Sequence, residues 1–554
     1  MLTCNGKLLK SLAKAGRDWL RSHYHHVNEL NVFPVPDGDT GTNMLMTMEN
    51  AYKEIEHSDS TNAARIASSI GRGAMMGSRG NSGTIMSQLW IGFGKALGEA
   101  EVFDAELLAK ALREATETAY RGVQRPVEGT ILTVAREMTE EIEASFEEEK
   151  DLKVLLEKMV ARGWQAVERT PELLPVLKKA GVVDSGGTGL VYVIEGMLRH
   201  LNGEATLVEG ITGLSGDLLQ AQFDDHGPQI EHPGENIYDV QFVVKGKELH
   251  APTIKAAMER MGDSVVVVGA EDIVKVHVHV RNPGIPLEYA ANVGPISDVV
   301  VENMLEQYEE YLRQRLGEAT PAEEPVELKT VEPGNVAVVA VAAGPGMAKV
   351  FAGLGVAGLV NGGQTNNPST QELLDAVDAL TTDKVILLPN NKNIILSANQ
   401  VVQLAGNRQV RVIPTRTFPQ GVAAMFNGYD ANGDLDEVYN AMNDAKDDII
   451  TAEITTATRS VELDGVAVTQ GQIIGLLDGQ LKVSGDTVEE VALGLLGDIE
   501  DIDAMELITI YYGEGKTSTD AQALADTLSE KFEDMEFDVV FGGQPHYPYI
   551  LSIE

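Results

Sequence analysis

The chain has 554 residues, of which 43% are hydrophobic and 23% are charged, and this indicates a globular protein of two to four domains. Its formal net charge of -41 argues against nucleic acids and anionic membranes as partners, because both bind basic surfaces. The single cysteine, Cys4, excludes an intrachain disulfide and favours a cytoplasmic location, and no apolar run reaches the roughly 18 residues of a membrane span. We therefore expect no signal peptide and no stable membrane insertion.

Residues 1–201 are predicted to form a helical domain. Apolar side chains recur at helical spacing in three segments, namely Leu8, Leu12, Ala15 and Trp19, then Leu45, Met48, Tyr52 and Ile55, then Ile131, Val134, Met138 and Ile142. Four glycine-bearing loops separate the predicted helices: "PDGDTG", "GSRGNSG", "RPVEGT" and "VVDSGGTG". Most of the unusual chemistry of this part of the chain lies in those loops.

The first loop belongs to "NVFPVPDGDTGTNM", residues 31–44, and carries Asp37 and Asp39 directly before a helical pattern. Two carboxylates this close repel each other unless a cation lies between them, and Mg²⁺ prefers carboxylate, water and phosphate oxygens. The start of the following helix offers N–H groups and a positive dipole end to an anion. A tight turn with Thr42 or Asn43 as the helix cap is the structural alternative. The loop predicts a metal–phosphate site.

The second loop, "GSRGNSGTIM" at residues 77–86, places three glycines beside Ser82 and Thr84, where a helix begins. It is neither a Walker A loop nor a dinucleotide-binding fingerprint, so alone it is weak evidence for a ligand. Next to the aspartate loop it favours a second phosphate cradle. The stretches "PVEGTILT" (126–133) and "VVDSGGTGL" (182–190) add two more loop-to-helix junctions with small polar residues.

The rest of the chain changes pattern. Residues 236–315 contain β-branched runs of strand length, "IYDVQFVV" and "SVVVVGAEDIVKVHVHV", which predict an α+β middle domain. The polar segment 202–235 and the acidic, proline-bearing segment 316–334 are interpreted as linkers. In residues 335–554, strand and helix patterns alternate, which predicts an α/β domain with a mostly parallel sheet.

Together, the four loop motifs of residues 1–201 resemble those of the DhaL-type ADP-binding subunit of dihydroxyacetone kinases. The whole chain is similar to the ATP-binding subunit of bacterial fatty acid kinase (the FakA type). That likeness extends to "VKVHVHV", "GGQTNNPST", "LPNNKNIILSANQ", "PTRTFPQG" and "GGQPHYPYILSIE". The resemblance implies a multidomain kinase with an all-α helical barrel that binds ATP and Mg²⁺. It also implies that the C-terminal domain has a fold like that of the fatty-acid-binding partner and docks that partner.

The same resemblance implies roles for individual residues. Asp37, Asp39 and Thr40 would act in catalysis, and the two aspartates would hold Mg²⁺ against the ATP phosphates. Asn31 is the candidate for a third metal position, where dihydroxyacetone kinases carry an aspartate. Thr40 stands where those enzymes have a histidine near the phosphates. The remaining implied nucleotide-binding residues are Thr42, Asn43, Gly80, Asn81, Ser82, Gly83, Thr130, Asp184 and Gly186.

A histidine pair marks the predicted middle domain. His277 and His279 are two residues apart on a predicted strand, so they share one face of it. Two imidazoles suit Zn²⁺, which usually takes four ligands, and the alternative is an exposed pair on the solvent face of a sheet. In fatty acid kinases a cysteine on a neighbouring strand joins the pair. Here the resemblance places Asp239 at that position, so the site either binds zinc more weakly or is lost.

Phosphoryl transfer depends on positioning and charge neutralisation more than on covalent help. A fatty acid carboxylate is ionised at pH 7 and needs no base, and the four loop motifs contain neither histidine nor lysine. We therefore hypothesise that ATP phosphorylates a fatty acid presented by a separate, DegV/FakB-like fatty-acid-binding protein. The alternatives are a kinase of a small hydroxyl substrate such as dihydroxyacetone and a non-enzymatic nucleotide-sensing adaptor. A homodimer stays open as the oligomeric state.

Overall fold

The structure, a computed structural model, describes residues 1–31, 38–123, 125–204, 236–246, 249–269, 273–303, 326–463 and 465–554. The chain divides into two compact units, which are described separately below. The first unit combines Met1–Thr206 with Val326–Glu554, and the second is Leu207–Pro325. Most of the two predicted linkers, 202–235 and 316–334, lies outside the described residues.

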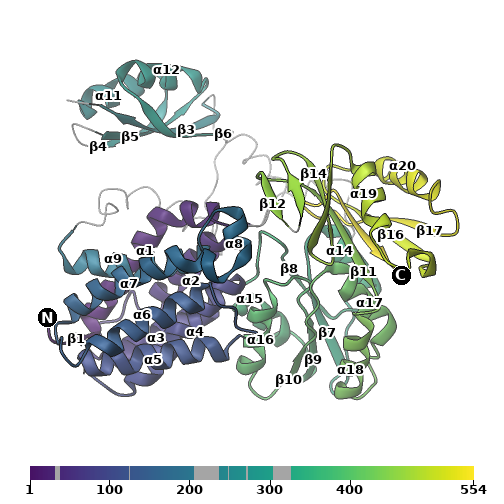
Figure 1. Cartoon of the computed structure of the whole chain (residues 1–554), viewed down its shortest axis with the longest axis horizontal. Coiled ribbons are helices and arrows are strands. Elements are labelled where there is room, and N and C mark those ends of the chain that lie inside the picture. The colour runs from purple at the N-terminus through teal and green to yellow at the C-terminus, as the bar shows by residue number, and fades with distance from the viewer. Residues whose placement is uncertain are drawn as a thin grey trace. The chain divides into compact units, whose positions relative to one another are not determined.

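The N-terminal part of the first unit is helical, as Figure 1 shows in purple and blue. Its helices are α1 (Gly6–Glu29), α2 (Thr40–Lys53), α3 (Ala63–Met76), α4 (Gly80–Leu97), α5 (Ala105–Arg121), α6 (Ile131–Ser145), α7 (Leu152–Leu173), α8 (Pro175–Ala180) and α9 (Ser185–Leu201). Consecutive helices pack together from α1 to α7, and α9 packs against both α7 and α1, so the helices close into a ring. Two short strands, β1 (Cys4–Asn5) and β2 (Val102–Phe103), pair antiparallel. The predicted all-α barrel is confirmed.

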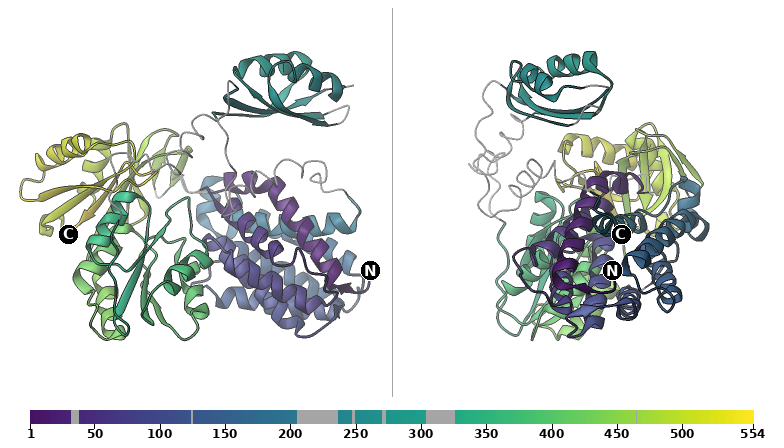
Figure 2. Two further views of the ribbon diagram at one scale, coloured as in Figure 1. Left: turned by 180° about the vertical axis from the view of Figure 1, so that it is seen from behind. Right: turned by 90° about the vertical axis from the view of Figure 1, so that its left-hand side faces the viewer.

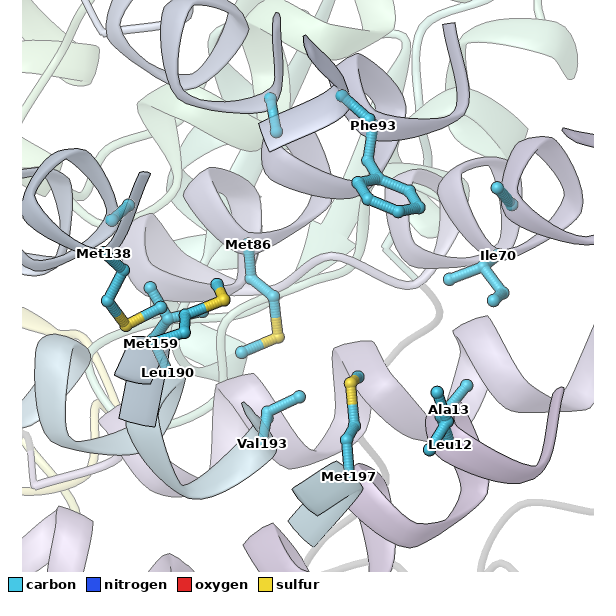
Figure 3. Packing of buried hydrophobic residues seen from close by; sticks show 14 of the residues in the cluster. Leu12, Ala13, Ile70, Met86, Phe93, Met138, Met159, Leu190, Val193 and Met197 are labelled. Atoms are coloured by element: carbon cyan, nitrogen blue, oxygen red, sulfur yellow. The ribbon is translucent and has the colours of Figure 1, made fainter. Parts of the chain in front are cut away.

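The core of the barrel follows the helical periodicity of the sequence. Leu45, Met48 and Tyr52 of α2 are buried, as is Ile55 just beyond the end of this helix, and so are the four apolar residues predicted on α6. Figure 3 shows Met86, Met138 and Val193, from α4, α6 and α9, directed into a common apolar interior. Although the helices have long apolar faces, none in the described part of the chain is long and apolar enough to cross a membrane.

In its described residues, the second unit forms a four-stranded antiparallel sheet with two helices. The strands β3 (Tyr238–Lys245), β4 (Asp263–Gly269), β5 (Ile273–Val280) and β6 (Ile296–Asn303) are arranged in the order β4-β5-β3-β6. The helices α11 (Ala251–Met258) and α12 (Gly284–Val293) lie on one face of the sheet in both views of Figure 2. Alternate residues of β5, including Val276 and Val278, are buried in the core that these helices cover. The α+β prediction is confirmed.

The C-terminal part of the first unit begins with a parallel sheet of strand order β10-β9-β7-β8. These strands are β7 (Val336–Ala342), β8 (Gly358–Asn361), β9 (Lys384–Leu388) and β10 (Gln409–Val412). One face of β7 packs with α14 (Pro345–Gly353), α17 (Phe418–Gly428) and α18 (Leu435–Ala445), and the other packs with α15 (Thr370–Asp378) and α16 (Ile395–Leu404). Because both faces are covered, every residue of β7 is buried, as the unbroken apolar run "VAVVAVA" predicts.

A second, six-stranded sheet of order β15-β14-β11-β18-β16-β17 follows. The strands of this sheet are β11 (Ile450–Thr456), β14 (Ile473–Leu477), β15 (Gln480–Gly485), β16 (Leu507–Tyr512), β17 (Glu536–Phe541) and β18 (Tyr549–Ile553). The elements that connect them are the separate hairpin of β12 (Val461–Leu463) and β13 (Val466–Val468), the helices α19 (Val488–Gly497) and α20 (Ser518–Ser529), and the 3₁₀ turn Ile502–Ala504. Among its described strand pairs, β16–β17 is parallel and the others are antiparallel. The expected mostly parallel sheet is therefore correct for the first sheet and wrong for the second.

The reason for that difference is visible in the turn between β14 and β15. Asp478 and Gly479 both have positive φ, 49° and 78°, which is the backbone of a two-residue hairpin turn. Such a turn joins antiparallel neighbours, whereas parallel neighbours need a long crossover. The "DG" dipeptide between two apolar runs is the local signal for this hairpin.

Candidate functional site

A cavity of about 1030 Å³ lies where the helical and C-terminal parts of the first unit meet. Three of the four predicted loops contribute to its wall, through Asn81 and Ser82, Val127 and Thr130, and Asp184, Ser185 and Gly186. Ligand pockets in proteins typically enclose roughly 300–1000 Å³, so the space is large enough for a nucleotide. The structure thus brings together loops that lie far apart in the sequence.

Two of these loops end in a residue that caps the N-terminus of the helix that follows the loop. Thr130 precedes α6, and its hydroxyl accepts from the backbone N–H of Leu132. Asp184 precedes α9, and its Oδ2 accepts from the N–H of Gly187 at 2.6 Å. Small polar residues are favoured at such positions because they satisfy helix N–H groups that have no partner within the helix. Capping therefore places both side chains at the cavity wall.

Asp184 and Gly186 shape the space beside Ser82. A Cβ atom added to Gly186 would lie 3.3 Å from Ser82 Oγ and 3.5 Å from Asp184 Oδ2, so these three residues adjoin one another. Burial raises the pKa of Asp184 to about 6, against the hydrogen bonds from the backbone of Gly187 and Ile131, which lower it. A carboxyl group in this state gains from a bound cation, because the cation favours its ionised form.

Two of the three glycines of the second loop, Gly80 and Gly83, serve helix packing. A Cβ on Gly80 would lie 2.6 Å from Asn43 Nδ2, and one on Gly83 would lie 2.4 Å from Thr47 Oγ1. Gly80 also has a φ of +58°. Both glycines therefore allow α4 to approach α2, and together with the buried Asn43 they lie behind the cavity wall formed by their neighbours Asn81 and Ser82.

In the aspartate loop, Asp37 lies outside the described residues, and Asp39 is the residue before α2. Asn367 of the C-terminal part donates a hydrogen bond from Nδ2 to Asp39 Oδ2 at 2.6 Å. The side-chain oxygen of Asn31 accepts from Thr40 Oγ1 at 3.0 Å and from Ser185 Oγ at 3.2 Å. These contacts tie the first loop to the fourth loop and place Asn31 and Thr40 beside the start of α9.

The expectation that α2 offers its first N–H groups to an anion is wrong for Gly41 and Thr42. The Oδ1 atom of Asn28, on α1, accepts from the N–H of Gly41 at 2.7 Å and from that of Thr42 at 3.2 Å. Its Nδ2 donates to Thr42 Oγ1 at 3.0 Å, so the Thr42 hydroxyl is also engaged. Asp39, rather than Thr42 or Asn43, is the N-cap residue. Local sequence carries no signal for a cap supplied by the preceding helix.

The side chains around Asp39 suit a hydrated Mg²⁺ ion. Asn367, Thr40 and Asn31 bring amide and hydroxyl oxygens to this place, and oxygen is the donor that magnesium prefers. One of them, Asn367 Oδ1, is buried and has no hydrogen-bond partner in the described structure. No group of three His, Cys, Asp or Glu side chains able to hold a metal occurs among the described residues, to which Asp37 does not belong. Water, phosphate and Asp37 would therefore have to complete the shell.

The cavity wall carries equal numbers of basic and acidic side chains, whereas the whole chain carries an excess of acidic ones. It carries four basic residues, Arg125, Lys392, Arg416 and Lys446, and four acidic ones, Asp184, Asp447, Glu453 and Asp478. The chain as a whole has 43 basic and 84 acidic residues. Burial raises the pKa of Glu453 to about 7, with the charge of Asp478 adding to the rise and that of Lys392 opposing it. The wall is thus less acidic than the protein, and a polyanion can be accommodated there.

Several wall residues were missed by the sequence analysis because they come from the C-terminal part. Gln364, Lys392 and Arg416 follow the ends of β8, β9 and β10 in the parallel sheet. Ligands of open parallel sheets bind beside the carboxyl ends of the strands, which is the rule that could have found these residues. The stretches "GGQTNNPST" and "LPNNKNIILSANQ" were notable in the sequence only for the family likeness, and the fold shows that they face the helical loops.

The histidine pair lies in the second unit. The strand register places Asp239 of β3 directly opposite His279 of β5, and Gln241 opposite His277. The side chains of Asp239 and His277 lie outside the description. On the other side of β5, Asp263 also pairs with His279, and its Oδ1 lies 3.8 Å from His279 Nδ1. Asp263 is thus a second carboxylate beside His279, one that local sequence does not reveal, and zinc binding remains a prediction.

Three family profiles match the chain. The C-terminal profile of the FakA-like fatty acid kinase proteins matches residues 337–554, and the middle-domain profile of the same proteins matches residues 235–311. The "DAK2 domain" profile matches residues 34–199. The three matches together span nearly all of the described structure, in the order that the motifs predict.

Similar proteins extend over the whole chain. An uncharacterized protein of Staphylococcus haemolyticus (strain JCSC1435) is 35% identical over 555 residues, covering 99% of each chain. Among solved structures, dihydroxyacetone kinase from C. freundii in complex with AMP-PNP and Mg²⁺ has a TM-score of 0.28 and 20% identity over 35% of this chain and 34% of that chain. The DegV family protein Cg2579 from Corynebacterium glutamicum has a TM-score of 0.29 and 16% identity over 40% of this chain and 96% of that one.

Proposed function

The chain belongs to the FakA-like family of fatty acid kinase proteins, and we propose that it is the ATP- and Mg²⁺-dependent component that phosphorylates the carboxylate of a fatty acid. The observation that carries this proposal is the 1030 Å³ cavity, where three glycine-bearing loops of the barrel meet the strand ends of the C-terminal part. Small polar side chains and helix starts line one wall, and Lys392, Arg416 and Lys446 lie on the other among three acidic side chains. That combination suits a nucleotide triphosphate and a second anion.

The nucleotide is assigned to the wall of the barrel. Asn81, Ser82, Thr130, Asp184 and Gly186 would contact it, since these predicted residues line the cavity. The first turn of α4 has no side-chain cap, so its N–H groups are suited to a phosphate. The packing roles of Asn43, Gly80 and Gly83 make their contribution to nucleotide binding indirect.

Magnesium is assigned to the aspartate loop. Asp37 and Asp39 would hold it, and Asn31, held by the hydroxyls of Thr40 and Ser185, would lie next to it. When bound, the ion neutralises phosphate charge, which is the main requirement of phosphoryl transfer. Thr40 acts in this assignment by fixing Asn31.

The acceptor carboxylate is assigned to the C-terminal wall. Arg416 and Lys392 are exposed there and supply positive charge to an incoming carboxylate and to the transferred phosphoryl group. A carboxylate is already a nucleophile at pH 7, so the reaction requires no general base. The products are ADP and an acyl phosphate, formed when a carboxylate oxygen attacks the γ-phosphorus and the β–γ bridging oxygen leaves with ADP.

The fatty acid is proposed to arrive on a separate fatty-acid-binding protein of the DegV/FakB-like kind. The family takes its description from one of the subunits of fatty acid kinase, which supports the existence of another. In this arrangement the partner retains the acyl chain while the carboxylate enters the cavity. Docking is assigned to the C-terminal part of the chain.

Reconstitution tests the proposal. The full chain is mixed with ATP, Mg²⁺ and a fatty acid loaded on the binding protein of the same organism, and hydroxylamine traps acyl phosphate as the hydroxamate. Hydroxamate that requires both ATP and the loaded partner is expected. Turnover of dihydroxyacetone without any partner would support the small-substrate kinase instead. ATP binding without any transfer would support the nucleotide-sensing adaptor.

A further inference from the structure

Asn367 joins the two parts of the first unit at the aspartate loop. It lies in the segment between β8 and α15, within the stretch "GGQTNNPST". Its side chain is only 2% exposed, and its Nδ2 donates to Asp39 Oδ2 at 2.6 Å. The hydrogen bond has a charged acceptor, which makes it stronger than one between neutral groups.

The position of Asn367 is held by its surroundings. Arg79 donates from one guanidinium nitrogen to the backbone oxygen of Asn367 at 2.7 Å, and a second nitrogen lies 3.0 Å from Glu372 Oε2. Glu372 in turn closes the capping box of α15 with Ser369. The loop that carries Asn367 is thus anchored on the barrel by Arg79 and on its own domain by the start of α15.

The other amide atom of Asn367 is unsatisfied. Its Oδ1 is buried and has no hydrogen-bond partner in the described structure. A buried acceptor without a partner costs about 1–3 kcal/mol, so proteins rarely retain one without a ligand, water or ion to complete it. The attachment of the two parts does not require this atom, because Ser78, Thr370 and Gln400 already form a buried hydrogen-bond network between them.

We propose that Asn367 is a positioning residue of the magnesium–nucleotide site, supplied to the barrel by the C-terminal part. Its N–H group fixes the carboxylate of Asp39, and its carbonyl oxygen accepts a hydrogen bond from water of the hydrated ion. This inference rests on the assignment of magnesium to Asp39 in the proposed function. It makes the C-terminal part a component of the phosphoryl-transfer site as well as the place where a partner docks.

Binding of AMP-PNP to the full-length protein tests the inference without any acceptor. Asn367→Ala is compared with Asn366→Ala, because Asn366 is the exposed neighbour in the same loop. Calorimetric titrations with AMP-PNP are repeated across a range of Mg²⁺ concentrations. They give the Mg²⁺ concentration at which half of the Mg²⁺-dependent gain in AMP-PNP affinity is reached. Loss of a residue that orients a metal ligand typically weakens metal binding about 10- to 100-fold. We expect a shift of that size in N367A, no shift in N366A, and unchanged nucleotide affinity of N367A without Mg²⁺.

The rate of acyl phosphate formation gives a second measurement. If Asn367 had only a structural role, this rate would not depend on Mg²⁺ differently in N367A and in the wild type. Excess Mg²⁺ should restore the rate of N367A, because the ligand Asp39 is still present. Equal weakening of AMP-PNP binding with and without Mg²⁺, or a Mg²⁺ dependence identical to that of the wild type, would overturn the proposal.

A second variant keeps the inference testable if N367A fails to fold. Asn367→Asp preserves the volume and places a carboxylate against that of Asp39, so Mg²⁺ with AMP-PNP should raise its Tm more than that of the wild type. An equal rise in both proteins would count against the role of Asn367. A wild-type chain that binds AMP-PNP with Mg²⁺ but forms no acyl phosphate would refute the fatty acid acceptor and leave the inference standing. Absence of Mg²⁺-dependent binding in the wild type would refute both.

Discussion

Ser78 Oγ lies 3.0 Å from Thr370 Oγ1, and both side chains are fully buried although they belong to different parts of the first unit. Gln400 Oε1 accepts from Ser78 at 2.8 Å and from Thr370 at 2.9 Å, while its Nε2 donates to Ser87 at 3.0 Å. A buried network with every member satisfied is specific, because any displacement would leave several polar groups without partners. It fixes the C-terminal part against the loop that precedes α4, and thereby fixes both walls of the cavity.

Replacement of the central glutamine should reveal this coupling. Gln400→Leu removes one hydrogen-bond partner from each of three buried hydroxyls, those of Ser78, Thr370 and Ser87, and we expect a loss of about 2–4 kcal/mol in the free energy of unfolding. Gln403→Leu, at an exposed position of the same helix, is the matched control and should change stability by less than about 0.5 kcal/mol. Urea denaturation of both variants measures the difference. Equal stabilities would mean that the network does not hold the two parts together.

The aspartate loop supplies the second prediction. Asp37→Ala and Asp39→Ala should each abolish acyl phosphate formation while the protein remains folded, because both carboxylates are assigned to the metal and Asp39 belongs to no apolar core cluster of the described barrel. Far-ultraviolet circular dichroism checks the fold, and the hydroxamate assay checks the activity. Near-normal turnover of both variants at saturating Mg²⁺ would refute the metal assignment.

The sequence was sufficient for the features that depend on local pattern. The apolar spacing of Leu45, Met48, Tyr52 and Ile55 predicted the buried face of α2, and all four side chains are in the core, although α2 itself ends at Lys53. Polar residues before the helical patterns identified the starts of α6 and α9, because capping is a local interaction. The loops that line the cavity could therefore be named before the fold was known.

Contacts between distant segments could not be predicted in the same way. Asn28 caps α2 from a different helix, and Asn367 reaches Asp39 across 328 residues of sequence. Neither contact leaves a periodicity or a spacing that a single sequence can show. Arg416 was likewise visible only as part of the stretch "PTRTFPQG", since its place in the cavity depends on how the C-terminal sheet packs on the barrel.

Glu453 gives the third prediction, a pH dependence of stability. Burial raises its pKa from an ordinary value of 4.5 to about 7, so the folded protein holds a proton that the unfolded chain releases between those values. Stability therefore falls as pH rises from about 4.5 to 7, and the full cost remains above pH 7. Glu453→Gln removes the ionisation and should stabilise the protein at pH 8 by up to roughly 3 kcal/mol.

The difference between the two proteins should disappear at low pH. Below about pH 4.5 both the folded and the unfolded states of the wild type carry protonated Glu453, so E453Q and the wild type should unfold alike. Chemical denaturation at pH 4, 6 and 8 checks the prediction. A stability gain of E453Q that is independent of pH would show that packing, and not ionisation, is responsible.

The basic wall of the cavity provides the fourth prediction. Arg416→Ala should lower kcat for acyl phosphate formation by about 10- to 1000-fold, because a positioned positive charge stabilises the transferred phosphoryl group. Arg411→Ala is a suitable control, since Arg411 lies on β10, pairs with Asp436 at 3.1 Å and does not line the cavity. Thermal unfolding should be unchanged in R416A, because the side chain is exposed. A normal kcat in R416A would remove this residue from the site.

The histidine pair supplies the last prediction. If His277, His279 and Asp239 share a zinc ion, protein prepared without chelators should contain about one zinc per chain by elemental analysis. Asp239→Cys should tighten the metal because a thiolate is the softer ligand, and Asp239→Ala should loosen it. Asp263, which pairs with His279 from the other side, is the alternative carboxylate ligand, so Asp263→Ala tells which aspartate contributes. Either loss should lower the melting temperature of the second unit and leave AMP-PNP binding intact. Zinc-free protein in which Asp239→Ala melts like the wild type would mean that the histidines are an exposed strand pair.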